Sequence, residues 1–199
     1  MRSRTVLSLA SLALVVALGG AAAAEEIAVG EKAPDFKVKA TDGKEYTLES
    51  FKDAKAIIVT FTCNSCPVAV AYEDRFIAFA KKYKEKGVVF LAINCNTSEK
   101  LPEMKQRAEE KGFPFIYAYD ETSESGHKYG ARVTPHLFVI DKDRKIAYRG
   151  SFDDKQDGPT KQYLASAVDA LLGGKKVELT STKAFGCGIK LKKKEPPKA

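Results

Sequence analysis

A strongly apolar stretch that leads directly into a pair of cysteines is the feature that most constrains this fold. Residues 56–62 read Ala-Ile-Ile-Val-Thr-Phe-Thr, and a run so rich in β-branched and aromatic residues favours a central strand covered on both faces. Cys63-Asn64-Ser65-Cys66 follows at once, and then Pro67. Proline suits the first turn of a helix because its missing N–H costs nothing there. The order strand, Cys-x-x-Cys, helix therefore predicts two sulfurs at a helix N-terminus.

The rest of the chain alternates between strand and helix patterns. An N-terminal hairpin is expected over 36–40 and 45–48, with its turn at Asp42-Gly43. The later elements are expected as a helix ending at Gly87, a strand over 88–94, a helix from Ser98 to Lys111, a strand over 115–119, a short helix from Asp120 to Tyr129, a strand over 136–140 with its hairpin partner 145–149, and a helix from Thr160 to Gly173. Strands that alternate with helices favour a parallel core sheet, to which the last hairpin adds an antiparallel edge.

Three regions are expected along the chain. Residues 1–24 combine Arg2 and Arg4, an apolar run and an alanine-rich end, which is the order of a cleavable export signal. A retained membrane anchor is the alternative, although the apolar run is short for a bilayer span of roughly 20 residues. Residues 25–174 have the size of one domain, and residues 175–199 form a C-terminal extension. We therefore expect a periplasmic or otherwise exported protein with no stable membrane span after cleavage.

The basic charge is concentrated at the end of the chain. The formal net charge is +7, and lysines gather at 190 and 192–194. No aromatic residues alternate with them, as a surface that stacks nucleic-acid bases would need. Nucleic acid is therefore not expected as a partner. A solvated, disordered end is the simplest interpretation, and a loose attraction to anionic lipid or to an acidic partner is the alternative.

The cysteine pair indicates redox chemistry. A thiol attacks as its thiolate, and a helix N-terminus favours that negative charge. Cys63 would attack a disulfide of a partner protein, and Cys66 would then attack Cys63 and release the reduced partner. In reverse, the pair oxidises a dithiol. A structural disulfide or half of a zinc site is the alternative, but zinc needs a second close ligand pair, which His127 and His136 do not form. Neither a metal nor a cofactor is expected.

Pro135 supports the redox interpretation. It stands after Val133-Thr134 and before a predicted strand, where a cis X–Pro bond would mark a tight, specified turn. Pro135 resembles the cis-proline that faces the dithiol in thioredoxin folds, which implies that it would present the Thr134 backbone to a partner. An ordinary trans proline at the start of an edge strand is the alternative.

Several segments together resemble the peroxiredoxin-like branch of the redoxin/thioredoxin superfamily. They are 30–36 (GEKAPDF), 63–67 (CNSCP), 72–75 (YEDR), 111–115 (KGFPF), 134–135 (TP) and 185–187 (FGC). The resemblance spans nearly all of the mature chain. It implies an α/β thioredoxin fold: a central mixed sheet flanked by helices, with an N-terminal β-hairpin extension and a C-terminal tail.

The same resemblance implies roles for individual residues. It makes Cys63 and Cys66 the redox pair, and it gives Thr134, Pro135, Asn64, Ser65 and Pro67 the task of shaping the site. Two departures from thioredoxins proper are visible: Thr62 replaces the tryptophan before the first cysteine, and Ile57 replaces a buried aspartate that accepts a proton. Deprotonation of Cys66 then needs water or another group, for which Glu73 is a candidate.

A thiol peroxidase with an antioxidant role is the second function that the resemblance implies. Cys63 would reduce a hydroperoxide, and Cys66 would resolve the resulting sulfenic acid. Peroxiredoxins carry a proline and a threonine before the reactive cysteine and an arginine opposite it. Here Thr60 matches, Ala56 replaces the proline, and Arg132 is displaced in sequence.

Cys95 and Cys187 have open roles. Cys95 follows the strand beside the active-site strand, and it is a small buried residue, a partner of Cys187 in a disulfide, or a relay thiol. A different class of function is copper binding by Cys63, Cys66 and His136, since thiolates suit Cu(I). A binding module with idle cysteines is a further alternative.

Overall fold

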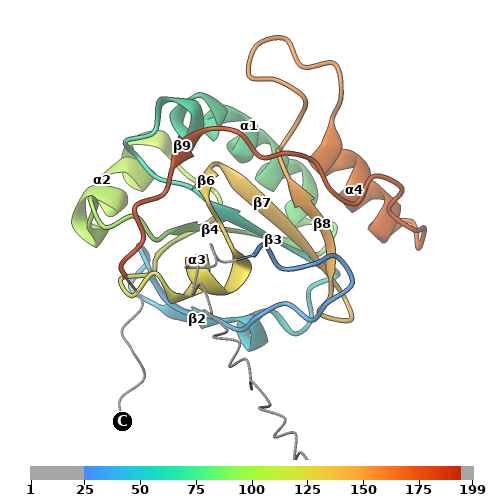
Figure 1. Ribbon diagram of the computed structural model, residues 1–199, viewed down its shortest axis with the longest axis horizontal. Helices are drawn as coiled ribbons and strands as arrows, with labels where there is room; N and C mark the ends of the chain where they lie inside the picture. The colour runs from blue at the N-terminus through green and yellow to red at the C-terminus, as the bar shows by residue number, and fades with distance from the viewer. Residues whose placement is uncertain (1–24, 194–199) are drawn as a thin grey trace, which may run out of the picture.

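The computed structural model describes residues 25–193, in which a seven-stranded sheet carries helices on both faces (Figure 1). The strand order in this sheet is β2-β1-β5-β4-β3-β7-β8, and β6 and β9 form a separate pair. The elements, in chain order, are β1 (Lys37–Ala40), β2 (Glu45–Thr47), the 3₁₀ helix η1 (Leu48–Phe51), β3 (Ala56–Phe61), α1 (Pro67–Lys84), β4 (Val88–Asn94), α2 (Leu101–Lys111), β5 (Ile116–Tyr119), α3 (Glu124–Tyr129), β6 (Val133–Thr134), β7 (His136–Asp141), β8 (Ile146–Gly150), α4 (Tyr163–Leu172) and β9 (Cys187–Gly188).

Strand β3 lies inside the sheet, as its apolar sequence predicts. All six of its residues are buried, and it pairs in parallel with β4 and antiparallel with β7. β5 continues the parallel part beside β4, while β8 and the β1–β2 hairpin are antiparallel. This arrangement confirms the predicted α/β thioredoxin fold with a central mixed sheet.

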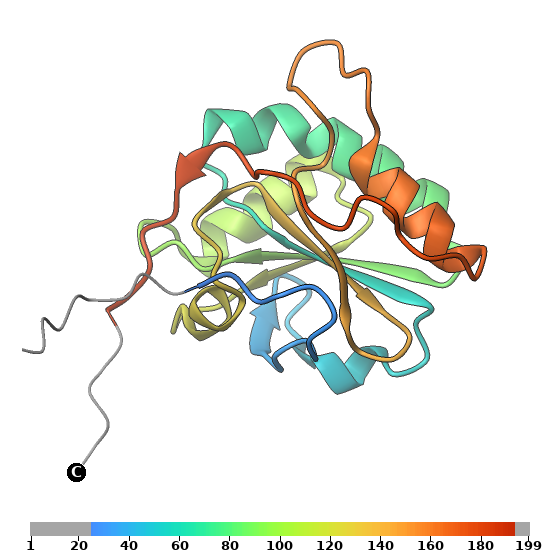
Figure 2. The same cartoon turned by 45° about the vertical axis from the view of Figure 1, so that its right-hand side comes forward.

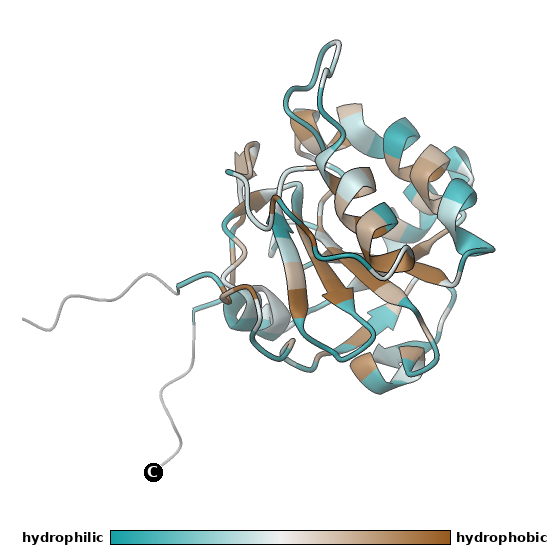
Figure 3. Ribbon diagram, turned by 90° about the vertical axis from the view of Figure 1, so that its right-hand side faces the viewer, coloured by the Kyte–Doolittle hydropathy of each residue, from teal (hydrophilic) through white to brown (hydrophobic). Residues whose placement is uncertain are grey.

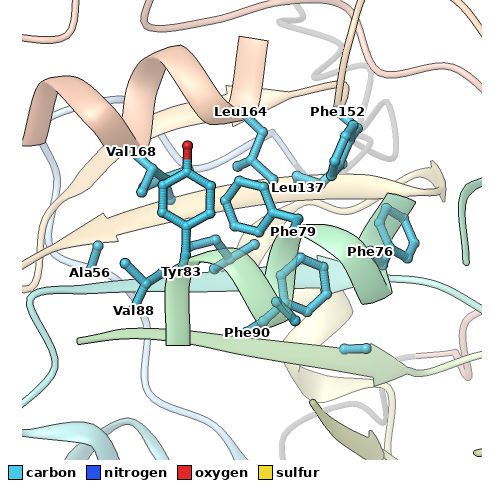
Figure 4. Close-up of a cluster of buried hydrophobic side chains, with 14 of the residues drawn as sticks. Ala56, Phe76, Phe79, Tyr83, Val88, Phe90, Leu137, Phe152, Leu164 and Val168 are labelled. Carbon is cyan, nitrogen blue, oxygen red and sulfur yellow. The ribbon is translucent and has the colours of Figure 1, made fainter. Parts of the chain in front are cut away.

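One face of the sheet is covered by α1, α2 and α4. Phe76, Phe79 and Tyr83 project from α1 toward Phe90 of β4 and toward α4 (Figure 4). The ring centroids of Phe76 and Phe90 are 5.5 Å apart. The strands between the helices are the most hydrophobic part of the ribbon (Figure 3). This packing fixes the axis of α1, and with it the position of the cysteines at its N-terminus.

The opposite face lies against α3 and η1 (Figure 2). Phe61, the last residue of β3, contacts the rings of Tyr129 and Phe138 at centroid distances of 5.6 and 5.8 Å. These ring contacts therefore fix the end of β3 on this face of the sheet, two residues before Cys63.

Three helices begin later than their expected N-caps. α2 starts at Leu101, with Lys100 rather than Ser98 as its N-cap. The expected caps of the other two, Asp120 and Thr160, bond to polar groups near the start of the helix without being its N-cap. The Asp120 carboxylate accepts hydrogen bonds from the Thr122 and Ser125 N–H groups, and α3 starts at Glu124. The Thr160 hydroxyl donates to Asp154 at 2.6 Å, and α4 starts at Tyr163.

The C-terminal extension, residues 175–193, packs on the domain and pairs with two of its strands. After α4 the chain runs back across the molecule (red in Figure 1). Arg149 of β8 exchanges backbone hydrogen bonds with Thr180 and Thr182, and β9 then pairs with β6. Residues 175–193 therefore reach the part of the fold that holds the cysteines.

The expected export signal, residues 1–24, and the last part of the basic tail, residues 194–199, lie outside the described residues. Between residues 25 and 193, no helix combines the length and the apolar character that a membrane crossing requires.

Candidate active site

The two cysteines lie where β3 gives way to α1. The Thr62 N–H donates to Ile93 in β4 at 2.9 Å and so extends the pairing of β3 by one residue. Cys66 is the N-cap of α1, and its sulfur accepts a hydrogen bond from the Ala69 N–H at 3.4 Å. Both sulfurs are thus near the helix N-terminus, although only 4% of Cys63 and 2% of Cys66 is exposed.

The peptide bond between Thr134 and Pro135 is cis, as predicted, and it borders both sulfurs. The Cys66 thiol donates to the Thr134 carbonyl oxygen at 3.1 Å. The Thr134 hydroxyl oxygen lies 3.4 Å from Cys63 Sγ. Thr134 therefore contacts each member of the dithiol, through its backbone on one side and its side chain on the other.

The surroundings of Cys66 favour its thiolate. Burial alone would raise the pKa of Cys66, but hydrogen bonding by the Cys187 thiol, by the Thr134 side chain and by the Ala69 N–H outweighs burial and lowers the pKa below its usual value. The mechanism inferred from the sequence needs Cys66 as a nucleophile, and a lowered pKa increases the share of its thiolate at a given pH.

The loop between the cysteines is held by a residue that the sequence analysis missed. The buried Glu99 carboxylate accepts hydrogen bonds from the Asn64 N–H at 2.8 Å, from the Ser65 N–H at 2.9 Å and from the Ser65 hydroxyl at 2.5 Å. It also accepts from the Asn94 side-chain amide at 2.7 Å. Glu99 is 33 positions beyond Cys66 in a loop, so no local spacing signals this contact.

Asn64 and Ser65 contact further groups around the dithiol. The Tyr117 hydroxyl donates to Asn64 Oδ1 at 2.8 Å, while the Ser65 hydroxyl is 3.8 Å from Cys63 Sγ. Pro67 is the first residue of α1. The expected site-shaping residues thus gather around the cysteines, and their role in exchange remains a prediction.

Glu73 and Thr60 are not directed at the sulfurs in the way their candidate roles require. The Glu73 carboxylate forms a two-pronged ion pair with Arg107, at 3.0 and 2.7 Å. The Thr60 hydroxyl is buried and has no hydrogen-bond partner among residues 25–193. Thr134, rather than Thr60, is the threonine whose hydroxyl contacts Cys63.

His136 is a buried side chain beside Phe138, with their ring centroids 4.6 Å apart. Burial, reinforced by the charges of Arg149 and Arg132, lowers the pKa of His136 to about 4. Within the described residues, no three His, Cys, Asp or Glu side chains form a group that could hold a metal ion. The copper set considered from the sequence therefore does not assemble in this structure.

Cys95 and Cys187 lie in different surroundings, and all four cysteines are free thiols. Cys95 is buried, with its sulfur packed near Gly126 and Leu191. Burial and the nearby charge of Asp120 raise the pKa of the Cys95 thiol, which suits a packing role. Cys187 instead packs against Cys66 and Cys63.

A dithiol at a helix N-terminus, facing a cis-proline in a thioredoxin fold, defines the class of thiol-disulfide oxidoreductases. The model of the Redoxin family matches residues 28–168, which is more than half of the chain. The chain belongs to the Redoxin family.

One similar protein has this activity in its name, and two solved structures share the fold. Thiol-disulfide oxidoreductase ResA of Bacillus thuringiensis subsp. konkukian is 30% identical over 125 residues, which cover 61% of this chain and 69% of that protein. An uncharacterized conserved protein from Geobacillus kaustophilus has a solved structure with a TM-score of 0.78 and 36% identity, covering 86% of this chain and 94% of that one. A hypothetical protein from Sinorhizobium meliloti 1021 also gives a TM-score of 0.78, with 34% identity and coverage of 84% and 97%. The expected superfamily is confirmed.

Proposed function

We propose that this oxidoreductase exchanges disulfides with partner proteins through Cys63 and Cys66. The observation that carries the proposal is the position of both sulfurs at the N-terminus of α1, in contact with the cis Thr134–Pro135 peptide. Such a site stabilises a thiolate and places two sulfurs within reach of each other. Disulfide exchange requires both the thiolate and the second sulfur close to it.

The reaction has two steps. The Cys63 thiolate attacks one sulfur of a partner disulfide, which forms a mixed disulfide and expels the other partner sulfur as a thiolate. The Cys66 thiolate then attacks Cys63 Sγ, forms the Cys63–Cys66 bond and releases the second partner thiolate. The partner is reduced by two electrons and the protein is oxidised by two. The reverse sequence oxidises a partner dithiol.

The lowered pKa of Cys66 supports its part in the second step. A resolving thiol must be deprotonated when the mixed disulfide forms, and the hydrogen bonds at Cys66 favour its anion. Water can then accept the Cys66 proton, and Glu73, which is paired with Arg107, is not required for it. This explains how Cys66 could lose its proton although Ile57 stands where thioredoxins have a buried aspartate.

Reduction of insulin disulfides tests the proposal. We expect wild type to accelerate this reduction, Cys63→Ser to lose the acceleration, and Cys66→Ser to accumulate a mixed disulfide through Cys63. Cys95→Ser is the matched control, because Cys95 belongs to the hydrophobic cluster on the opposite face of the sheet rather than to the cluster of the dithiol, and it should keep the wild-type rate. Equal rates for wild type and Cys63→Ser would disprove the proposal.

Peroxide reduction is the second candidate function. The Thr134 hydroxyl, 3.4 Å from Cys63 Sγ, favours it because peroxide cleavage needs donors near the reacting oxygens. Stopped-flow oxidation of the reduced protein by hydrogen peroxide separates the two functions. A rate no faster than that of a free thiol of similar pKa supports disulfide exchange, whereas a rate several orders of magnitude faster that requires Cys63 supports the peroxidase.

We also propose that the protein works outside the cytoplasm, after removal of residues 1–24. The order of charged, apolar and alanine-rich segments supports this, and an oxidising compartment suits a dithiol enzyme. The intact mass of protein recovered from a periplasmic fraction tests it. Periplasmic protein whose mass begins at Glu25 supports the proposal, and protein found only in the cytoplasmic fraction with Met1 retained overturns it.

A further inference from the structure

A third thiol lies beside the proposed redox pair and has no part in the two-step exchange. Strand β9 pairs antiparallel with β6, and Cys187 stands opposite Thr134 in this pair. Thr134 is the residue that contacts Cys63 and Cys66. Cys187 is partly exposed, whereas the other two cysteines are buried. It is therefore the most exposed of the three cysteine residues.

The segment that carries Cys187 is firmly placed on the molecule. The Gly186 backbone approaches the Thr134–Pro135 peptide so closely that a Cβ there would overlap the Thr134 carbonyl oxygen. On the N-terminal side, the Phe185 ring contacts Tyr72 of α1 at a centroid distance of 6.1 Å. On the C-terminal side, the Ile189 N–H donates to the Arg132 carbonyl at 3.0 Å. These contacts hold β9 over the start of α1 (Figures 1 and 2).

Cys187 interacts directly with Cys66. Cys187 packs at the start of α1 against the cluster that contains Cys63, Cys66 and Ala69, and its interaction with Cys66 lowers the pKa of the Cys66 thiol and raises the pKa of Cys187. Both sulfurs thus share one helix N-terminus. Because Cys187 stands opposite Thr134, whose carbonyl oxygen contacts the Cys66 sulfur, the two sulfurs are neighbours, and a bond between them requires an S–S distance of about 2.0 Å.

We propose that Cys187 is a third redox thiol, which exchanges with Cys66 so that the oxidised protein contains a Cys66–Cys187 disulfide. This inference rests on the proposed function, because the Cys63–Cys66 disulfide is its starting point. The Cys187 thiol loses its proton to solvent, and its thiolate attacks Cys66 Sγ. The Cys66–Cys187 bond forms, the Cys63–Cys66 bond breaks, and Cys63 leaves as a thiolate. No net electrons are gained or lost.

The exchange would change which sulfurs face an incoming reactant. Cys63 becomes free again while the protein still carries two oxidising equivalents. The disulfide moves to a pair that includes the partly exposed Cys187, where an external thiol can reduce it by attack at that sulfur. The C-terminal extension thereby links the buried dithiol to the surface.

Disulfide mapping in the double variant Cys63→Ser/Cys95→Ser tests the bond itself, since only Cys66 and Cys187 remain. After incubation with glutathione disulfide and alkylation, we expect a linked pair of peptides containing Cys66 and Cys187, without bound glutathione. Cys63→Ser/Cys187→Ser is the matched control, in which Cys66 and Cys95 should remain unlinked. Two alkylated cysteines or stable glutathione adducts in the first variant would overturn the inference. If that double variant does not fold, as judged by circular dichroism, the same mapping in Cys63→Ser alone gives the same two outcomes.

The oxidised wild type tests the exchange. Cys63 should be alkylated in oxidised wild type and at least about tenfold more slowly in oxidised Cys187→Ser, where it stays bonded to Cys66. Equal protection of Cys63 in both proteins would overturn the exchange step. Failure of the proposed function would give a different result, namely insulin reduction at the same rate with and without Cys63. The Cys66–Cys187 mapping does not depend on insulin reduction, so the two failures can be told apart.

Discussion

The Glu99 carboxylate accepts hydrogen bonds from both the backbone N–H and the hydroxyl of Ser65, at 2.9 and 2.5 Å. These donors, together with the Asn64 N–H, belong to the loop between the two cysteines. N–H groups ahead of a helix ordinarily stabilise a nearby thiolate. Here the Asn64 and Ser65 N–H groups donate to the Glu99 carboxylate instead, and this carboxylate also places a negative charge beside the dithiol. The loop gains order, and the thiolate form loses part of its usual stabilisation.

Replacing the carboxylate should reverse both effects. We expect Glu99→Gln to lower the free energy of unfolding by about 2–3 kcal/mol, because charge-assisted hydrogen bonds are lost and buried donors are left unpaired. We also expect a less negative reduction potential, since the reduced form no longer faces a fixed negative charge. Urea unfolding and equilibration with glutathione measure the two quantities.

Glu109→Gln is the control for this prediction. It makes the same substitution on the exposed face of α2 and should leave both quantities unchanged. A Glu99→Gln protein with wild-type stability and potential would show that the carboxylate neither orders the loop nor acts on the dithiol.

The thiol of Cys187 should govern the titration of Cys66. In Cys63→Ser, alkylation of Cys66 should follow a pKa below the usual thiol value of 9.0, because hydrogen bonds from Cys187 and its neighbours favour the thiolate despite burial. In Cys63→Ser/Cys187→Ala the thiol donor is gone, and the midpoint should move upward. Rates of iodoacetamide labelling against pH, with Cys66 identified by peptide mapping, measure both midpoints.

The same lowered pKa has a consequence for stability. Because the folded protein holds the Cys66 pKa below that of the unfolded chain, the thiolate contributes stability that is fully present above pH 9.0 and is lost as the pH falls through the lowered pKa. The reduced protein should therefore gain stability relative to Cys66→Ser as the pH rises toward that value. A constant difference between the two proteins across this range would contradict the assignment.

His136 should make the protein sensitive to acid. Burial lowers its pKa from 6.5 to about 4, so the unfolded chain binds a proton that the folded protein rejects. Stability is then complete above pH 6.5 and falls between pH 6.5 and 4, by about 3 kcal/mol in total. His136→Phe, which keeps an aromatic ring beside Phe138, should remove this part of the acid dependence in urea unfolding. If the variant loses stability over this range as steeply as wild type, His136 is not the responsible group.

Much of the fold follows from patterns that the sequence displays locally. The buried strand at 56–62, the Cys63–Cys66 spacing and Pro135 each carry a local physical signal, and each lies in the fold where that signal indicates. The place of Cys66 at a helix N-terminus also follows from Pro67, whose ring favours the first turn. These predictions needed only the chemistry of neighbouring residues.

The rest of the site depends on contacts between segments distant in sequence. Glu99 and Cys187 reach the dithiol through a loop and an extension, and neither has a periodic pattern that specifies its partner. Glu73 shows the opposite case. It lies on α1 near the cysteines in sequence, which suggested that it accepts the proton of Cys66. In the fold, however, its carboxylate pairs with Arg107 of α2.

The position of β9 depends on Gly186, and a single methyl group should displace it. A Cβ at this residue would overlap the Thr134 carbonyl oxygen, and its φ of +147° is a conformation that favours glycine. We expect Gly186→Ala to move β9 off β6, to lower the free energy of unfolding by about 1–3 kcal/mol, and to speed alkylation of Cys66 as its cover is removed. Gly188→Ala is the matched control within the same strand, because a Cβ there meets nothing within 4 Å. It should label at the wild-type rate. If Gly186→Ala also labels at that rate, then β9 does not shield Cys66, and the close approach of Gly186 to the cis peptide has no bearing on access to the dithiol.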